Sequence, residues 1–276
     1  MRKINYPLIV SDFDGTLVKA DGTISETNKQ AISKYIEAGG AFAISTGRMP
    51  SGILSRAREL GLKGMMSACQ GAIIMDIETG KVISSGVIPH HTTLKICKKM
   101  EEMDLHIHAY DLWDFYCNKD DEALKFYEKA VRGKAKLVLD KPLSQFIEET
   151  GLCSYKFLAM VLPNDSQRIL KELDKENFEG CCTTQSDAVL VEVINKNYSK
   201  GTAVETLANY YNVPLSKTIA IGDQRNDISM IEKAGLGVAV KNADDLLKQA
   251  ADYVCEFTNE ENAVAAIIEK FGFSEE

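Results

Sequence analysis

The chain is predicted to be an α/β protein with a doubly wound parallel sheet and an inserted α+β domain. In its first third, short apolar runs typical of buried strands alternate with segments of helical periodicity. The apolar runs are 8–10, 41–44 and 65–68, and the helical segments are 26–38 and 50–60. Strands that alternate with helices form parallel sheets covered on both faces, so this alternation defines the fold class.

Helix boundaries in this region carry the expected signals. Ser25 is a suitable N-cap for the helix 26–38, and Gly39 and Gly40 end it. Pro50 stands in the first turn of the helix 50–60, and Gly61 follows its end.

The alternation changes after the expected strand 65–68, where 72–75 and 82–87 flank an expected hairpin turn at 78–81, and it resumes after Asn195. Between these points helical segments mix with strand pairs, as in the helix 92–103, the strands 106–110 and 115–118, and the helix 121–131. The length of 276 residues suits two domains. We therefore expect a core formed by 1–84 and 193–276, and an inserted α+β domain at 85–192.

The composition disfavours some classes of binding partner and indicates the cellular compartment. Asp and Glu outnumber Lys and Arg by 40 to 32, a net charge of −8 that disfavours binding to nucleic acid or anionic lipid. No apolar run approaches the ~20 residues that span a bilayer. Seven scattered cysteines without Cys-x-x-Cys spacing indicate reduced thiols, so we expect a cytoplasmic protein, as a monomer or small homo-oligomer.

A pair of aspartates directly follows the first strand. The segment DFDGT at 12–16 separates Asp12 and Asp14 by two residues, so both carboxylates can point to one side, and Gly15 permits a sharp turn. Carboxylates this close repel each other unless a cation lies between them, and a hard dication such as Mg²⁺ prefers oxygen ligands. One carboxylate could attack phosphorus while the other transfers protons. The alternative is a turn with two solvated aspartates.

A second acidic segment, GDQRND at 222–227, follows the expected strand 218–221 and opens a helix. Asp223 could supply a third carboxylate to a magnesium site. Asn226 and Asp227 stand at the start of the helix, where capping residues and anions are favoured. They either belong to the site or only cap the helix.

Two further segments stand where the chain enters a helix. STGR at 45–48 follows the strand 41–44, and its hydroxyl and exposed backbone N–H suit a phosphate oxygen, or else form a capped turn. Lys200 precedes Gly201 at a helix start, where a lysine is unfavourable unless an anion or carboxylate lies nearby. Alternatively, Lys200 is a surface charge.

Taken together, these segments resemble the haloacid dehalogenase-like superfamily, and within it the Cof-type sugar-phosphatase branch. The resemblance rests on the order and spacing of DFDGT, STGR, SKG at 199–201 and GDQRND, with a matching flank at 234–240. It departs at CQGA, 69–72, where Asn commonly precedes the Gly-Ala pair.

The resemblance implies a role for each position. Asp12 would be the nucleophile that forms an aspartyl-phosphate, and Asp14 the acid and then the base. Mg²⁺ would be held by Asp12, the backbone carbonyl of Asp14, and Asp223. The phosphoryl oxygens would be held by Thr46, Lys200, Asn226 and the backbone amides at Phe13 and Gly47. Asp227 would orient Lys200 or a metal-bound water, and the insert would be a cap that closes over the substrate.

The expected function is therefore magnesium-dependent hydrolysis of small phosphate monoesters, either sugar phosphates or phosphorylated cofactors. Alternatives are a phosphomutase or phosphotransferase with the same nucleophile, or a non-catalytic binding protein, which the presence of both Asp12 and Asp14 disfavours.

The insert also contains features that this function does not explain. His106 and His108 share one face of a strand, which makes a zinc pair conceivable, but no further ligand is evident at a suitable spacing. Trp113, Phe115 and Tyr116 form an aromatic cluster, either as internal packing or as a substrate platform.

Overall fold

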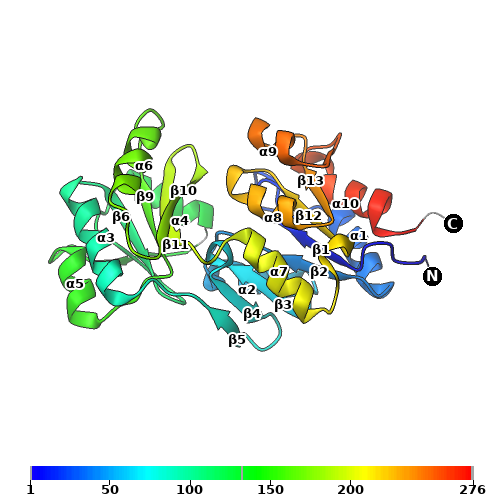
Figure 1. Cartoon of the computed structure of the whole chain (residues 1–276), viewed down its shortest axis with the longest axis horizontal. Coiled ribbons are helices and arrows are strands. Elements are labelled where there is room, and N and C mark those ends of the chain that lie inside the picture. Colours follow the sequence, from blue (N-terminus) through cyan, green and yellow to red (C-terminus); the bar gives the residue numbers. More distant parts are fainter. Residues whose placement is uncertain (1, 132, 275–276) are drawn as a thin grey trace. The chain divides into compact units, whose positions relative to one another are not determined.

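The computed structural model describes residues 2–131 and 133–274, which form two compact units (Figure 1). The core unit contains the chain up to Thr46, the segment Leu54–Ser84 and the chain from Ser199. The cap unit contains Gly47–Ile53 and Ser85–Tyr198. The predicted α/β fold with an additional α+β region is confirmed.

The centre of the core unit is a five-stranded parallel sheet with the order β14-β13-β12-β1-β2. Its strands are β1 Leu8–Ser11, β2 Ala41–Ile44, β12 Thr218–Gly222, β13 Leu236–Ala239 and β14 Tyr253–Val254. Strands β1 and β12 are buried along their whole length, as expected for a parallel sheet with both faces covered. Leu8 pairs with Ala41 on one side and Thr218 on the other, so the strands end at a common edge.

Helices connect these strands and cover the sheet. They are α1 Glu26–Glu37, α2 Pro50–Glu59 (of which the part up to Ile53 groups with the cap unit), α7 Lys200–Tyr210, α8 Ile228–Lys233, α9 Asp245–Ala250 and α10 Ala263–Ile267, with the 3₁₀ turns η2 Leu215–Lys217, η3 Arg225–Asp227 and η4 Asn259–Glu261 and the π-helix η5 Ile268–Gly272. Ser25 caps α1, its Oγ accepting from the N–H of Asn28 at 3.1 Å, as predicted. Ala203, Val204 and Leu207 of α7 pack on the sheet.

The strand β3, Met65–Ala68, forms where it was expected but joins the parallel sheet only in part. Ser67 makes one parallel bridge with Ser45, just after β2, whereas the full register of β3 is antiparallel to β4, Ile73–Asp76, in a small sheet completed by β5, Val82–Ser85. The reason is the tight turn η1, Cys69–Gly71, in which all three residues have positive φ. A side chain on Gly71 would overlap the backbone carbonyl of Ser199, so only glycine fits there.

The cap unit is a six-stranded sheet with the order β10-β11-β9-β6-β7-β8 and four helices. Its strands are β6 His106–Tyr110, β7 Phe115–Cys117, β8 Lys136–Leu137, β9 Lys156–Met160, β10 Cys181–Asp187 and β11 Leu190–Asn195, and its helices are α3 His90–Glu102, α4 Glu122–Val131, α5 Leu143–Thr150 and α6 Ser166–Lys175. Helix α5 was not predicted. Side chains of β6 alternate, so Ile107 and Ala109 enter the apolar core while His106 and His108 face the other side.

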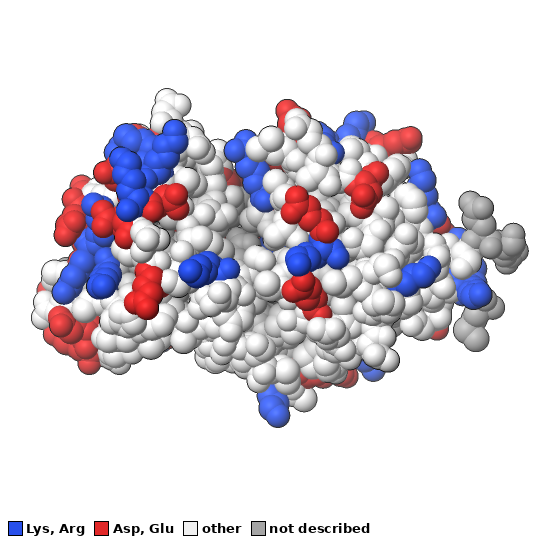
Figure 2. All heavy atoms as spheres, in the orientation of Figure 1, with Lys and Arg blue, Asp and Glu red and all other residues white. Residues whose placement is uncertain are grey.

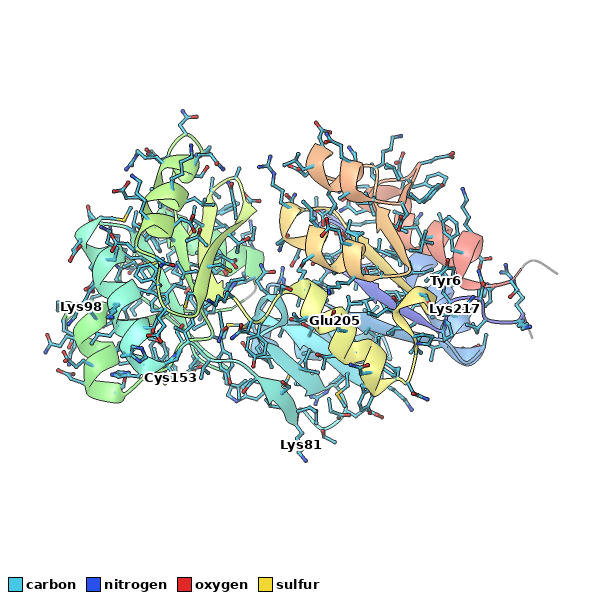
Figure 3. The ribbon with its side chains drawn as sticks, viewed as in Figure 1. Tyr6, Lys81, Lys98, Cys153, Glu205 and Lys217 are labelled. Atoms are coloured by element: carbon cyan, nitrogen blue, oxygen red, sulfur yellow. The ribbon has the colours of Figure 1, made fainter. Side chains whose placement is uncertain are left out.

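Charged side chains of both signs lie on the surface of the protein. On the face drawn in Figure 2, acidic and basic side chains occur together on both units. In Figure 3, Lys217 lies beside Tyr6, with the Lys217 Nζ 5.6 Å from the centroid of the tyrosine ring. All seven cysteines are free thiols, as expected. Among the described residues, no helix has the length and apolar character needed to cross a membrane.

Replacing Tyr211 by Phe should lower the free energy of unfolding by about 1–3 kcal/mol. The Tyr211 hydroxyl accepts from the N–H of buried Met65 at 3.0 Å, and the substitution leaves that donor unpaired. Tyr210→Phe is the matched control, because the neighbouring Tyr210 is exposed. Urea unfolding of both variants checks this, and equal midpoints would show that the hydrogen bond contributes nothing.

Candidate active site

The predicted site residues stand where strands of the core sheet end. Asp12 directly follows β1, Thr46 follows β2 by two residues, and Asp223 directly follows β12. Because β1 lies between β2 and β12 in a parallel sheet, the three positions share one edge. One oxygen from each of the Asp12, Asp223 and Asp227 carboxylates lies within 4.8 Å of the others.

Lys200 places a buried ammonium group among these carboxylates. Its Nζ donates to Oδ1 of Asp12 and to Oδ1 of Asp227, each at 2.5 Å, and the side chain is only 2% exposed. Lys200 is the first residue of α7, whose N-terminal dipole disfavours a positive charge. The carboxylates of Asp12 and Asp227 provide the negative charge that offsets the unfavourable helix dipole at Lys200. Lys200 is therefore not a surface charge.

Asp227 both belongs to the cluster of acidic residues and caps the start of its own helix, the two alternatives that the sequence left open. Its Oδ2 accepts from the backbone N–H groups of Asp223 and Gln224, at 2.9 and 3.0 Å, and so closes the loop before α8. Its Oδ1 meanwhile binds Lys200. The carboxylate therefore caps its own loop and holds the ammonium group toward Asp12.

Asp223 is fixed by Thr16, the last residue of the DFDGT segment. The Thr16 Oγ1 donates to the Asp223 Oδ1 at 2.7 Å, and both side chains are buried. Gly15 has a φ of 78°, and a side chain there would overlap the Asp223 carboxylate. This close approach explains why the segment needs glycine. Sequence reasoning did not assign a role to Thr16, although its place within the motif was visible.

The site carries more negative charge than Lys200 can balance. Burial is the main cause that raises the pKa of Asp12 well above its usual value; Lys200 opposes the rise, and Asp227 and Asp223 add to it. Burial, followed by the charge of Asp227, raises the pKa of Asp223 to about 6. Burial alone would lower the pKa of Lys200, but Asp12 and Asp227 hold it above its usual range.

The donor set fits a hard divalent cation. Asp12, Asp223 and Asp227 offer carboxylate oxygens in a buried space that lacks one or two positive charges, and oxygen ligands suit Mg²⁺. The Asp14 side chain is exposed and is not one of these three acidic residues. Asp14 stands two residues after Asp12 in the chain, and its side chain is exposed where that of Asp12 is buried.

Thr46 and Asn226 are joined through Gln70, the position at which the sequence departs from the family pattern. The Gln70 N–H donates to the Thr46 carbonyl at 3.1 Å, and the Gln70 Oε1 accepts from the Asn226 Nδ2 at 3.0 Å. Gln70 therefore has a structural contact in the site, which sequence reasoning had left in doubt. Phe13 is fully buried. Gly47 follows Thr46 in the chain but belongs to the segment that groups with the cap unit.

The cap unit contains a cavity and a buried ion pair that the sequence did not predict. The Lys156 Nζ lies 3.1 Å from the Glu192 Oε1, and both side chains are nearly inaccessible. A lysine within the apolar run 155–162 was the available signal. The cavity has a volume of about 220 Å³, and its lining includes Arg48, Tyr110, Trp113, Phe115, Tyr127 and Lys134. The predicted aromatic cluster is divided, because Tyr116 packs against Phe146 instead.

Comparison with known proteins gives a consistent result. The sequence matches the haloacid dehalogenase-like hydrolase family over residues 9–268. Phosphatase YwpJ of Bacillus subtilis is 28% identical, with 94% of this chain and 97% of that protein covered. The 5-amino-6-(5-phospho-D-ribitylamino)uracil phosphatase YwtE of the same organism is 27% identical, with 95% and 96% covered. A solved haloacid dehalogenase-like hydrolase from B. subtilis superposes with a TM-score of 0.86 at 26% identity, over 96% of this chain and 99% of that one.

The buried aspartates and the lysine lie at the carboxyl ends of the parallel strands, which is where open α/β sheets bind their ligands. This chain belongs to the haloacid dehalogenase-like hydrolase family, which confirms the predicted resemblance. It is a phosphatase enzyme, and its family acts on small phosphorylated compounds. Phosphotransferases of this superfamily generally use a divalent metal ion.

In the metal-free protein, Asp223 should make the free energy of unfolding fall as the pH rises from about 4 to 6. The pKa of Asp223 is about 6 when folded and about 3.9 when unfolded, so only the folded state holds the proton in this window. This contribution is complete below pH ~4 and lost by pH ~6. Asp223→Asn should remove this part of the pH slope in urea unfolding with a chelator present.

The matched control for this measurement is Asp245→Asn, because the Asp245 side chain is 94% exposed. It should retain the wild-type slope. An unchanged slope in Asp223→Asn would contradict the raised pKa of the buried carboxyl.

Proposed function

We propose that this enzyme is a magnesium-dependent phosphatase that hydrolyses small phosphate monoesters through an aspartyl-phosphate on Asp12. The observation that carries the proposal is the Asp12 carboxylate, buried at the end of β1 and bound to Lys200, with Asp223 and Asp227 beside it. A carboxylate held in this way is positioned to attack, and the neighbouring positive charge favours its ionised form.

Mg²⁺ would be held by Asp12, Asp223 and the backbone carbonyl of Asp14, and it would supply positive charge to the phosphoryl oxygens. Lys200 supplies a further positive charge from α7. Thr46, Asn226 and the backbone amides of Phe13 and Gly47 would bind the remaining phosphoryl oxygens. Asp227 positions Lys200, to which it is hydrogen-bonded.

The reaction would proceed in two displacements. An Asp12 carboxylate oxygen bonds to phosphorus, the bond to the leaving oxygen breaks, and Asp14 donates a proton to that oxygen. A water molecule then attacks the aspartyl-phosphate, Asp14 takes its proton, and inorganic phosphate leaves with the Asp12 carboxylate restored. The exposed side chain of Asp14 suits proton exchange with the leaving group and with water.

Charge stabilisation must supply most of the rate enhancement. Phosphate monoester hydrolysis requires up to ~10²¹-fold acceleration, whereas a positioned acid and base typically supply ~10²–10⁴-fold. The larger part comes from positive groups arranged around the transferring phosphoryl group. This is why Lys200 is buried among carboxylates, where its orientation is fixed before substrate arrives.

The substrate class that we propose is sugar phosphates or phosphorylated cofactors, selected by the insert 85–192 acting as a cap on the core 1–84 and 193–276. The name of the relative YwtE gives its substrate as a uracil that carries a phosphorylated ribitylamino group. The cap-unit cavity pairs aromatic walls, such as Trp113 and Tyr110, with the basic side chains of Arg48 and Lys134. Aromatic faces suit rings or sugar faces, and basic groups suit anions.

We further propose that the enzyme works in the cytoplasm. All seven cysteines are free thiols, a state that persists in reducing compartments.

Asp12→Asn should reduce phosphate release from a panel of phosphorylated metabolites by at least about 10³-fold, because the amide is not a nucleophile. The fold should survive, since the substitution removes one of several crowded buried carboxylates. Malachite-green detection of phosphate and a thermal unfolding scan measure the two effects. Asp245→Asn on the surface of the core unit is the control, and full activity of Asp12→Asn would refute the nucleophile.

Chelation of divalent metal should abolish turnover, and Mg²⁺ alone should restore it. Without the cation the buried carboxylates repel one another and repel the phosphoryl oxygens, which then lack the positive charge that would hold them. Steady-state rates across a magnesium titration after treatment with EDTA measure this. Turnover that persists after complete metal removal, as checked by elemental analysis, would contradict the proposal.

A further inference from the structure

Three side chains with nitrogen or sulfur donors converge within the cap unit, outside the site described above. His106 and His108 lie on one face of β6, and Cys117 on β7 stands directly opposite His108 in the strand register. The Nε2 atoms of the two histidines are 3.1 Å apart, and the Cys117 Sγ is 3.1 Å from the His106 Nε2. The three donor atoms lie within 4.8 Å of one another.

The spacing agrees with one face of a zinc coordination sphere. Zinc bonds of about 2.0–2.1 Å to nitrogen and 2.3 Å to sulfur place tetrahedral ligands about 3.3 Å apart for two nitrogens and about 3.6 Å for nitrogen and sulfur. The observed 3.1 Å separations are shorter by a few tenths of an ångström. Small side-chain rotations would therefore admit the ion without moving the strands.

Asp121 orients the first of these ligands. Its Oδ2 lies 3.0 Å from the His106 Nδ1, while its Oδ1 accepts from the Leu124 N–H at 2.9 Å and so caps α4. A carboxylate at Nδ1 keeps the proton on that nitrogen and directs the Nε2 lone pair inward. Carboxylate–histidine pairs of this kind are the usual second layer of metal sites in proteins.

The surroundings are closed and aromatic on the side of His108. Its ring centroid is 4.7 Å from that of Tyr127 and 5.0 Å from that of Phe115, and its Nδ1 lies 3.4 Å from the Tyr110 hydroxyl. His108 and Cys117 are inaccessible, but the Asp121 side chain is 44% exposed. An ion could therefore enter past His106 and Asp121, while the aromatic rings close the side of His108.

We propose that His106, His108 and Cys117 bind one Zn²⁺ ion in the cap unit, with Asp121 as the positioning carboxylate. Two imidazoles and a thiolate select Zn²⁺ over Mg²⁺, which prefers oxygen ligands, so this site and the acidic site take different metals. The ion joins β6 and β7, and through Asp121 it fixes the start of α4. The fourth position is open to a water molecule.

The competing arrangement is a hydrogen-bonded cluster without metal. The Cys117 thiol lies 3.2 Å from the Lys119 carbonyl and could donate to it, and one histidine Nε2 could donate to the other. In this arrangement each polar group has a hydrogen-bond partner without a metal. The test must therefore detect a bond between the metal and the sulfur atom.

The experiment uses the full-length protein, stripped with a chelator, dialysed and titrated with Zn²⁺ or with Co²⁺ as its spectroscopic substitute. We expect a thiolate-to-Co²⁺ charge-transfer band and one equivalent of Zn²⁺ per chain beyond any held by the aspartates, both lost in Cys117→Ser. Cys153→Ser is the matched control, because this half-buried cysteine lies elsewhere in the cap unit (Figure 3) and should leave both readings unchanged. Co²⁺ bound only to aspartates gives no thiolate band.

Asp121→Asn provides a variant that keeps the fold, because asparagine also caps helices. It should weaken zinc affinity by about 10–100-fold while retaining the charge-transfer band at saturation. Absence of the band in wild-type protein, or zinc stoichiometry unchanged in Cys117→Ser, would overturn the proposal in favour of the hydrogen-bonded cluster. These readings do not depend on phosphate release, so their failure would not affect the proposed phosphatase mechanism.

Discussion

The structure of the core unit depends on the crowding of three buried carboxylates around one ammonium group. Asp12, Asp223 and Asp227 come from two strand ends, and Lys200 comes from a helix start nearly 200 residues after Asp12. Burying these charges disfavours folding unless they are paired and hydrogen-bonded. The surrounding structure therefore provides a partner for each group, and these partners also fix the geometry that phosphoryl transfer needs.

Much of this site follows from the sequence because parallel strands end at one edge. DFDGT and GDQRND each follow an apolar run, and once both runs belong to one parallel sheet their acidic residues must lie close together. Lys200 was predictable by a similar argument, since a lysine at a helix start requires a nearby anion. Each pattern alone left a structural alternative open, and only their combination at one edge of the sheet indicated a shared site.

Contacts that depend on side-chain length or on a reversal of the chain could not be predicted in this way. Gln70 reaches Asn226 only because η1 folds back at three consecutive positive φ values, a conformation that the sequence CQGA does not specify. The same reversal pairs β3 with β4 along its length and leaves it a single parallel bridge to the end of β2. In the cap unit, Cys117 meets His108 through strand register, which depends on the turn at 111–114 and not on spacing along the chain.

The nucleophile that we propose, Asp12, must be ionised to attack, yet the burial of its carboxyl group raises its pKa and so favours the protonated form. Lys200 alone cannot resolve this conflict, because it is shared between Asp12 and Asp227 and faces three acidic groups. Removing Asp227 would free the ammonium group for Asp12 but would also unfasten the loop that holds Asp223, whose backbone N–H binds the Asp227 Oδ2. The excess of negative charge over the single ammonium group therefore cannot be removed without disrupting the site. A divalent cation that binds together with the substrate would balance it.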